Sequence, residues 1–268
     1  AFMEGYHVMQ THPQLYKAHS ENHVDHYEAA DSGKSSVESS RMGIKGAKTK
    51  DEIAAQFEHF ELLSEGMAGM IHQKELEIAR ECMDADLPED AAQGVPAWFG
   101  LIMQQVTERL RARGEPVPDL LKVAQSDPVN AVEFLFPHYF LLPIFTSMSA
   151  YRIRPLGPES CFFEIWSLTM FPEGEEPDPV MEPIVLPFDS PEFPPIPRQD
   201  YSNIPIQQKG LHARGFEYMR LSKNVEGLIS NYQRLIDGYL AGKPLENLAK
   251  ANHKLGGNFD GPIEDMSA

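Results

Sequence analysis

Apolar side chains recur at helical spacing in the first half of the chain. Between residues 51 and 84 they are separated by steps of three and four, which predicts a helix over this whole stretch. They are Ile53, Phe57, Phe60, Leu63, Met67, Met70 and Ile71. A second helix is expected from about residue 97 to 113 and a shorter third helix from 118 to 126, because Pro116 and the pair Asp127-Pro128 interrupt the pattern around them.

From residue 129 onward the pattern changes to short runs of β-branched and aromatic residues. Prolines and the turn Leu156-Gly157-Pro158-Glu159 separate these runs, which is typical of an antiparallel meander. The expected strands cover residues 132–136, 139–145, 149–155 and 161–169. The proline-rich stretch 172–197 predicts an irregular crossover. Helical patterns return at about 199–219 and 225–240.

Helices on both sides of a meander predict an α+β fold in which the sheet curls over a helix-backed cavity. Residues 29–50 are rich in Ser, Gly and Lys and have no apolar period, so we expect a mobile surface loop there. We expect one domain over residues 1–242 and a loose acidic tail over 243–268. A dense group of candidate functional residues follows Ala1 at once, and because chain ends fray, we expect a further segment to precede it.

Composition limits the possible function classes. The 268 residues include 23 Lys and Arg against 40 Asp and Glu, which gives a net charge of −17. This charge argues against binding nucleic acid or an anionic membrane surface, because both need clustered basic side chains. The longest apolar run, 134–151, is interrupted by prolines and a histidine, so no membrane span is predicted. Two cysteines cannot build a disulfide framework, and a reduced, cytoplasmic setting fits best.

The first candidate chemistry is metal binding by Glu4, His7 and His12. Residues five apart on a regular helix diverge by about 140°, so both imidazoles can face one ion only if the helix is bulged or ends between them. Pro13, directly after His12, favours such an ending. Two surface histidines near a frayed end are the alternative. Asp200, at the start of a predicted helix, could complete the triad of two histidines and one carboxylate that holds non-haem Fe(II), or it could only cap the helix.

Two further histidine features have a structural and a functional interpretation. His19, His23 and His26 have a helical spacing that could hold zinc. Acidic residues interleave with them, so a solvated amphipathic stretch is the favoured interpretation. His138 follows Phe136-Pro137, where a strand is broken by proline. It could line a cavity, although a strand-end histidine satisfied by the backbone is the favoured interpretation.

Three motifs together carry a resemblance to a known family. Glu4-Gly5-Tyr6-His7 followed by Thr11-His12 resembles the iron motif of Rieske non-haem iron ring-hydroxylating oxygenases, in their catalytic α subunit. Phe136-Pro137-His138 resembles the family's Phe-Pro-Asn element on the cavity-facing sheet, with His in place of Asn. Gln199-Asp200-Tyr201-Ser202-Asn203 resembles the acidic stretch that supplies the third iron ligand. The resemblance covers residues 1–242.

The resemblance implies that His7, His12 and Asp200 are ligands of a mononuclear Fe(II). It also implies that Glu4, where the family generally has Asp, links the iron site to the Rieske cluster of a neighbouring subunit. The implied fold is a helix-grip domain, in which a curved antiparallel sheet grips a long C-terminal helix. The implied assembly is a homo-oligomer, a trimer of α subunits.

The reaction implied by the resemblance is hydroxylation of an aromatic ring with O2, by a dioxygenase or a monooxygenase. The electrons would come from NAD(P)H through a ferredoxin or a reductase and then through a Rieske [2Fe–2S] cluster. By position, the walls of the substrate pocket are expected to include Val8, Phe136, His138, Leu141 and Phe145, all of which could equally be ordinary core residues.

One part of the family pattern is lacking in this sequence. The family binds its cluster through a Cys-x-His and Cys-x-x-His framework, and neither Cys82 nor Cys161 is followed by such a histidine. We therefore expect the cluster to lie on an N-terminal domain outside this sequence. Two other function classes stay open. One is a zinc-dependent hydrolase that uses His19, His23 and His26, and the other is a non-enzymatic carrier of hydrophobic ligands on the same fold.

Overall fold

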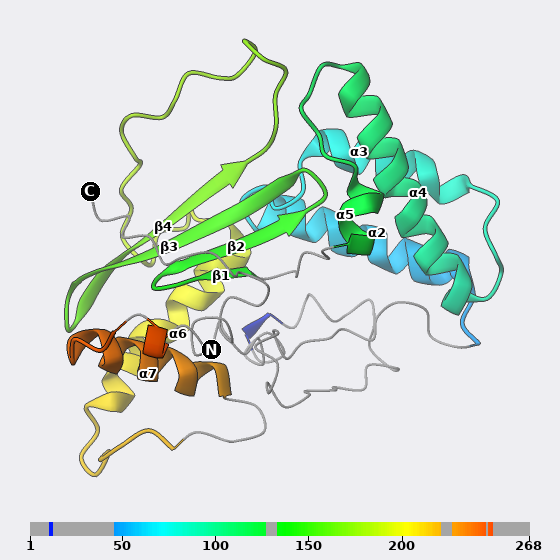
Figure 1. Ribbon diagram of the computed structural model, residues 1–268. Coiled ribbons are helices and arrows are strands. Elements are labelled where there is room, and N and C mark those ends of the chain that lie inside the picture. The colour runs from blue at the N-terminus through cyan, green and yellow to red at the C-terminus, as the bar shows by residue number, and fades with distance from the viewer. Residues whose placement is uncertain (1–10, 13–45, 127–132, 221–226, 245, 249–268) are drawn as a thin grey trace.

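The computed structural model describes residues 11–12, 46–126, 133–220, 227–244 and 246–248. Within these ranges a group of helices packs beside a four-stranded antiparallel sheet, and two more helices lie at another side of the sheet (Figure 1). This arrangement confirms the predicted α+β class. The helices of the described ranges include none with the length and apolar character needed to cross a membrane. The expected mobile loop lies outside the described residues, apart from its last few positions.

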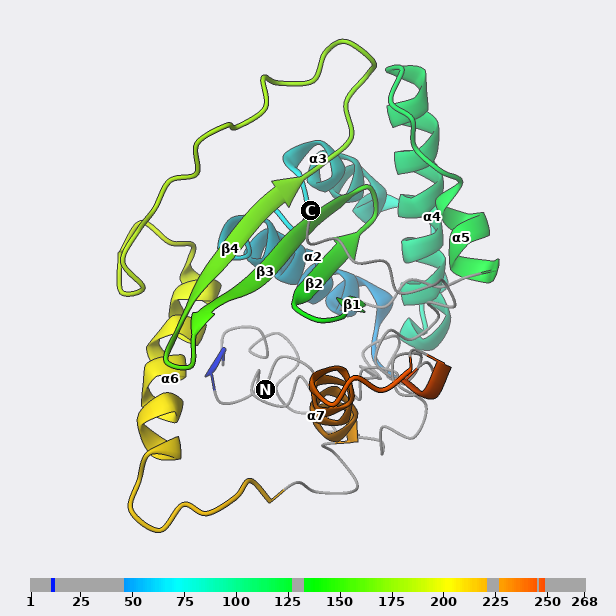
Figure 2. The ribbon, with the colours of Figure 1, turned by 60° about the vertical axis from the view of Figure 1, so that its left-hand side comes forward.

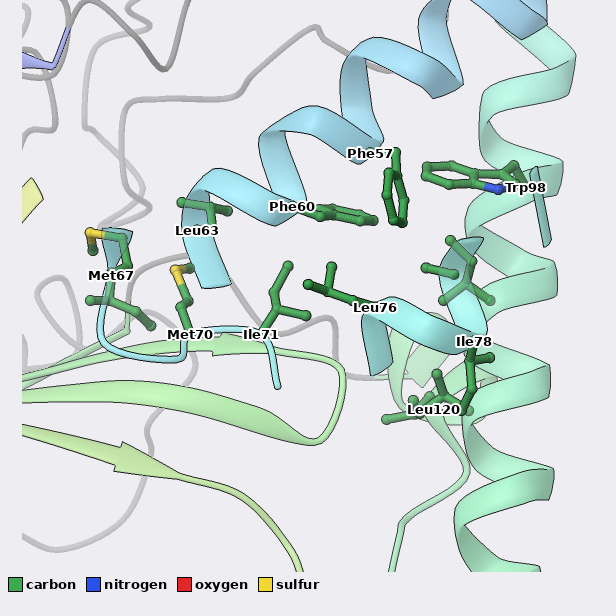
Figure 3. Packing of buried hydrophobic residues seen from close by; sticks show 14 of the residues in the cluster. Phe57, Phe60, Leu63, Met67, Met70, Ile71, Leu76, Ile78, Trp98 and Leu120 are labelled. Carbon is green, nitrogen blue, oxygen red and sulfur yellow. The ribbon is translucent and has the colours of Figure 1, made fainter. Parts of the chain in front are cut away.

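The helices before the sheet share one apolar core, part of which is shown in Figure 3. They are α2 (Thr49–Gly66), α3 (Gln73–Glu81), the short 3-10 helix η2 (Cys82–Asp84), α4 (Ala91–Ala112) and α5 (Leu120–Ser126). The Phe60 ring of α2 stacks on Trp98 of α4 with 5.7 Å between ring centroids. Phe60 also meets the edge of Phe145, which lies beside the sheet, at 5.7 Å. The aromatic core therefore continues from the helices to the sheet.

The prediction of a single helix over residues 51–84 is wrong, because the chain reverses its direction between α2 and α3. Ala68 and Gly69 have φ angles of 53° and 72°, in the left-handed region that ends helices. His72 then caps α3, since its side chain accepts from the Lys74 N–H while the Glu75 carboxyl accepts from the His72 N–H. The apolar spacing continues across this reversal because the residues within it turn back onto the same core.

Two helices begin earlier than the sequence pattern predicted. α4 begins at Ala91 instead of residue 97, because the Asp90 side chain accepts a hydrogen bond from the Ala92 N–H at 2.8 Å and caps it. α2 begins at Thr49, inside the stretch predicted to be a loop. The Thr49 hydroxyl donates to the carbonyl of Glu89 at 3.1 Å, which ties this start to the segment before α4. Both differences therefore come from contacts at the helix ends.

The predicted antiparallel meander is confirmed. Its strands are β1 (Glu133–Leu135), β2 (Tyr139–Ile144), β3 (Ser147–Gly157) and β4 (Ser160–Leu168), in the order β1-β2-β3-β4, and the sheet is open. The register aligns Phe134, Phe140, Tyr151 and Ile165 in one row. This row belongs to the buried face of the sheet, which packs against helices. Because successive side chains of a strand alternate between faces, Leu141 and Trp166 lie on the opposite face.

After the sheet, the chain follows an irregular crossover, as predicted, and then forms α6 (Pro195–Leu211) and α7 (Gly227–Leu240). α6 lies at one end of the β3–β4 hairpin (Figure 2), where the Glu159 carboxylate accepts from Gln208 Nε2 at 2.9 Å. α7 packs on the start of the sheet, with Tyr232 against Phe134 and Tyr239 stacked on Phe136. The sheet's grip on a long C-terminal helix is not confirmed and stays a prediction.

Candidate metal centre

Asp200 lies in the second turn of α6, and the sequence around it explains why the helix begins there. Pro194 is the N-cap of α6 and Pro195 is the first residue of its first turn, where proline's fixed φ and missing N–H are well tolerated. Because the helix begins at Pro195, Asp200 is too far inside it to act as its N-cap. The alternative role that the sequence left open for this carboxylate, helix capping, is therefore excluded.

The structure brings His12 and Asp200 together from positions 188 residues apart in the sequence. His12 Nε2 lies 3.0 Å from Asp200 Oδ1, and the two side chains are only 3% and 6% exposed. Thr11 is helical and His12 is not, which agrees with the helix ending that Pro13 predicted. This buried pair is the centre of the candidate site.

Two amide side chains of α6, before and after Asp200 in the sequence, also bind the segment Thr11–His12. Gln199 Oε1 lies 2.7 Å from His12 Nδ1, and Asn203 Nδ2 donates to the Thr11 hydroxyl at 3.1 Å. Residues four apart lie on one face of a helix. One side of α6 therefore binds Thr11 and His12 at three points, through Gln199, Asp200 and Asn203.

The electrostatics of His12 favour its protonated form when no metal is bound. Burial is the largest single influence and lowers the pKa of His12, but the hydrogen bonds to Asp200 and Gln199 and the Asp200 charge together raise the pKa above its ordinary value. Both ring nitrogens face oxygen atoms that can accept hydrogen bonds, an arrangement that suits the doubly protonated ring. A divalent metal ion would have to replace the proton on Nε2.

The donor geometry fits a divalent metal ion. A nitrogen and an oxygen ligand at about 2.1 Å from one ion, at a right angle to each other, are about 3.0 Å apart. His12 Nε2 and Asp200 Oδ1 are separated by 3.0 Å. Within the described ranges no group of three His, Cys, Asp or Glu side chains converges. The third expected ligand, His7, lies outside the described residues, as do Glu4 and the alternative zinc residues His19, His23 and His26.

Two buried tyrosines adjoin the pair. Tyr151, on the buried face of β3, is 2% exposed, and Tyr201, next to Asp200 on α6, is 4% exposed. Burial is the main cause that raises the pKa of both phenols, and the nearby Asp200 charge raises both further. The Tyr201 ring meets the edges of Phe163 and Phe193, each at 4.9 Å between centroids. Asp200 is therefore close to an aromatic layer between α6 and the sheet.

Four of the five residues expected to form the substrate pocket are described, and they lie at different places in β2 and in the turns that flank it. Phe136 and Phe145 lie in turns at opposite ends of β2 and contact different helices, α7 and α2. The pleat turns Leu141 to the face of the sheet opposite the buried Tyr151. His138 Nε2 accepts a hydrogen bond from Arg152 Nε at 3.3 Å, so a side chain and not only the backbone satisfies it. Val8 lies outside the described residues.

The comparison with protein families decides the family membership of this chain. The family described as "Ring hydroxylating alpha subunit (catalytic domain)" matches residues 1–242. The chain belongs to this family. An oxygenase role in general follows from this membership. The comparison with curated proteins gave no significant match, and neither did the comparison with solved structures.

The structure of this ring-hydroxylating α-subunit domain adds residues to the candidate site that the sequence did not predict to belong to it. Gln199 and Asn203 appeared in the acidic motif without a role of their own, although their spacing of four around Asp200 was a usable signal. Tyr201 stood in the same motif. Tyr151 gave no signal, because an aromatic residue in a strand is an ordinary core residue.

Proposed function

We propose that the domain holds a mononuclear Fe(II) through His7, His12 and Asp200 and hydroxylates an aromatic ring with O2. The observation that supports this proposal is the buried contact of 3.0 Å between His12 Nε2 and Asp200 Oδ1, in a chain of the ring-hydroxylating α-subunit family. Two imidazoles and one carboxylate leave open coordination positions, and iron held in this way supplies the activation of O2. The carboxylate also offsets part of the metal's positive charge.

The protein's own groups prepare the site in three ways. Asp200 and His12 lie on segments that dock against each other, so little ordering is needed when the metal binds. The aromatic layer of Tyr151, Tyr201 and Phe163 keeps water away from one side of Asp200. Gln199 holds the His12 ring from its other nitrogen. Glu4, close in sequence to His7, is proposed to link His7 by a hydrogen-bonded path to the Rieske cluster of a neighbouring subunit, which would supply the electrons.

The electron supply and the assembly complete the proposal. Ring hydroxylation needs electrons from outside the site, which would pass from NAD(P)H through a ferredoxin or reductase and a Rieske [2Fe–2S] cluster. Cys82 is buried within the helical core and Cys161 is a lone exposed cysteine in β4, so neither is placed to hold such a cluster. The cluster is therefore proposed to be on a separate domain, in a trimer of α subunits.

Iron binding by the purified chain tests the proposal. The chain is reconstituted with Fe(II) without oxygen, and the bound iron is measured after removal of free metal. We expect stoichiometric iron in the wild type and a loss of nearly all of it in Asp200→Ala and His7→Ala. Asp189→Ala, which removes an exposed carboxylate from the crossover, is the control and should bind normally.

Two outcomes would contradict the proposal. Iron binding that survives Asp200→Ala would remove Asp200 from the ligand set. A metal-free wild type that binds apolar ligands but no iron would favour the non-enzymatic carrier. If iron binds as expected, turnover of a panel of arenes with a Rieske protein and its reductase identifies the reaction.

A further inference from the structure

We infer that Gln199 is a positioning residue that selects which nitrogen of His12 binds the metal. The inference rests on the proposed function, because it concerns the same metal site. Its basis is the hydrogen bond of 2.7 Å between Gln199 Oε1 and His12 Nδ1, on the side of the ring opposite Asp200. No role in the site followed for Gln199 from the sequence.

The chemistry of the imidazole ring explains how the contact between Gln199 and His12 can select the nitrogen that binds the metal. A neutral imidazole carries one proton, on either nitrogen, and only the unprotonated nitrogen can bind a metal ion. An amide oxygen accepts hydrogen bonds and cannot donate them. Gln199 Oε1 therefore keeps the ring proton on Nδ1, and Nε2, the nitrogen 3.0 Å from Asp200, is the one left to bind the metal.

Asn203, the second amide of α6, holds the segment that contains Thr11 and His12, but it does not determine which ring nitrogen of His12 carries the proton. Asn203 Nδ2 donates to the Thr11 hydroxyl at 3.1 Å, one residue before the metal ligand. Among the hydrogen bonds of the described residues, that of Asn203 goes to Thr11 and not to the His12 ring. The two amides thus have different roles: Asn203 holds the side chain of the residue before His12, and Gln199 holds the ring of His12 and its tautomer.

Substitutions at Gln199 separate positioning from packing. Gln199→Met keeps a side chain of similar length and removes the acceptor, whereas Gln199→Glu keeps an acceptor oxygen. Gln207→Met is the matched control, because it makes the same change at an exposed position of the same helix. Co²⁺ binding is followed by its visible absorption, and Zn²⁺-loaded protein is used for ¹⁵N NMR of the histidine rings.

We expect Gln199→Met to weaken Co²⁺ binding by about 10–100-fold, the usual effect of removing a group that orients a ligand histidine. Gln199→Glu and Gln207→Met should bind Co²⁺ at least as well as wild type. In the Zn²⁺ form of the wild type, His12 should carry its proton on Nδ1 and the metal on Nε2. Gln199→Met should add a second form with the metal on Nδ1. Asn203→Leu should weaken binding without adding that form.

The inference is overturned if Gln199→Met binds Co²⁺ within about twofold of wild type, well short of the 10–100-fold loss expected for such a group. It is also overturned if Gln199→Glu binds as weakly as Gln199→Met, because packing and not the acceptor would then be responsible. Failure of the wild type itself to bind any of these metals would instead refute the proposed function. The two failures are therefore distinguishable in one set of titrations.

Discussion

Replacing Tyr201 by Phe should make the metal-free chain more stable. Tyr201 is 4% exposed, and its buried hydroxyl has no hydrogen-bond partner among the described residues. Its ring is held by edge contacts with Phe163 and Phe193, and Phe keeps both contacts. The substitution thus removes an unsatisfied buried hydroxyl and little else.

The expected gain follows from the cost of burying that hydroxyl. An unpaired polar group inside a protein costs about 1–3 kcal/mol on mutational scales. Phe leaves a small gap where the oxygen was, which offsets part of the gain. We therefore expect the free energy of unfolding to rise by about 1 kcal/mol, which corresponds to an increase of about 2–4 °C in Tm for a chain of this size.

Urea unfolding followed by circular dichroism measures this change, and the slope with denaturant should stay the same. Tyr151→Phe is the matched control. Tyr151 is equally buried, but its hydroxyl donates to Met67 Sδ at 3.6 Å, so its removal should give no gain. A loss of stability in Tyr201→Phe would show that the hydroxyl is hydrogen-bonded. Equal gains in both variants would show that the hydroxyl's lack of a partner is not the cause.

Three further predictions concern other parts of the molecule. The pKa of His12 is raised in the folded chain. The stability that His12 adds is therefore complete below its unfolded pKa of about 6.5 and is lost as the pH rises through the folded value. The difference in unfolding free energy between wild type and His12→Ala, measured without metal, should shrink as the pH rises through this range. Glu75→Ala should cost about 3 kcal/mol of stability in urea unfolding, since its fully buried carboxyl accepts from the Thr146 N–H and hydroxyl and the His72 N–H, whereas exposed Glu77→Ala should cost little. Glu4→Gln should cut turnover with a Rieske partner sharply and leave iron content intact, and equal loss of both would place Glu4 among the ligands.

The sheet could be predicted from the sequence because its signals are local. Each strand is a short aromatic or β-branched run, and the turn at Gly157-Pro158 follows from residues that are adjacent in the chain. The reversal between α2 and α3 could not be predicted, because no local signal in the apolar pattern marks it. Apolar spacing shows which side chains are buried and not the path of the backbone. The spacing of three and four residues continues through Met67, Met70 and Ile71, although the backbone there is not helical.

Residue types and spacing made the candidate site one of several alternatives, and the family resemblance made it the expected one. Spacing within one segment cannot show that His12 meets a carboxylate 188 residues later. The pocket residues show the same limit. Phe140, Leu141 and Leu142 are all apolar, so no alternation shows which of them face the buried side, and only the register with β3 places Leu141 on the other face.

The position of Asp200 depends on both faces of α6. Residues two apart on a helix diverge by about 200°, so Gln199 and Tyr201 point to nearly opposite sides. Tyr201 packs on Phe163 of the sheet, while Gln199 binds His12, and Asp200 lies between these two directions. Farther along α6, Gln208 fixes the helix to the β3–β4 turn through Glu159. The sheet therefore sets the depth and rotation of α6, and through them the distance between the carboxylate and the imidazole. In this arrangement a change in the aromatic layer would move Asp200 relative to His12, and would so alter the proposed metal site without replacing a proposed ligand.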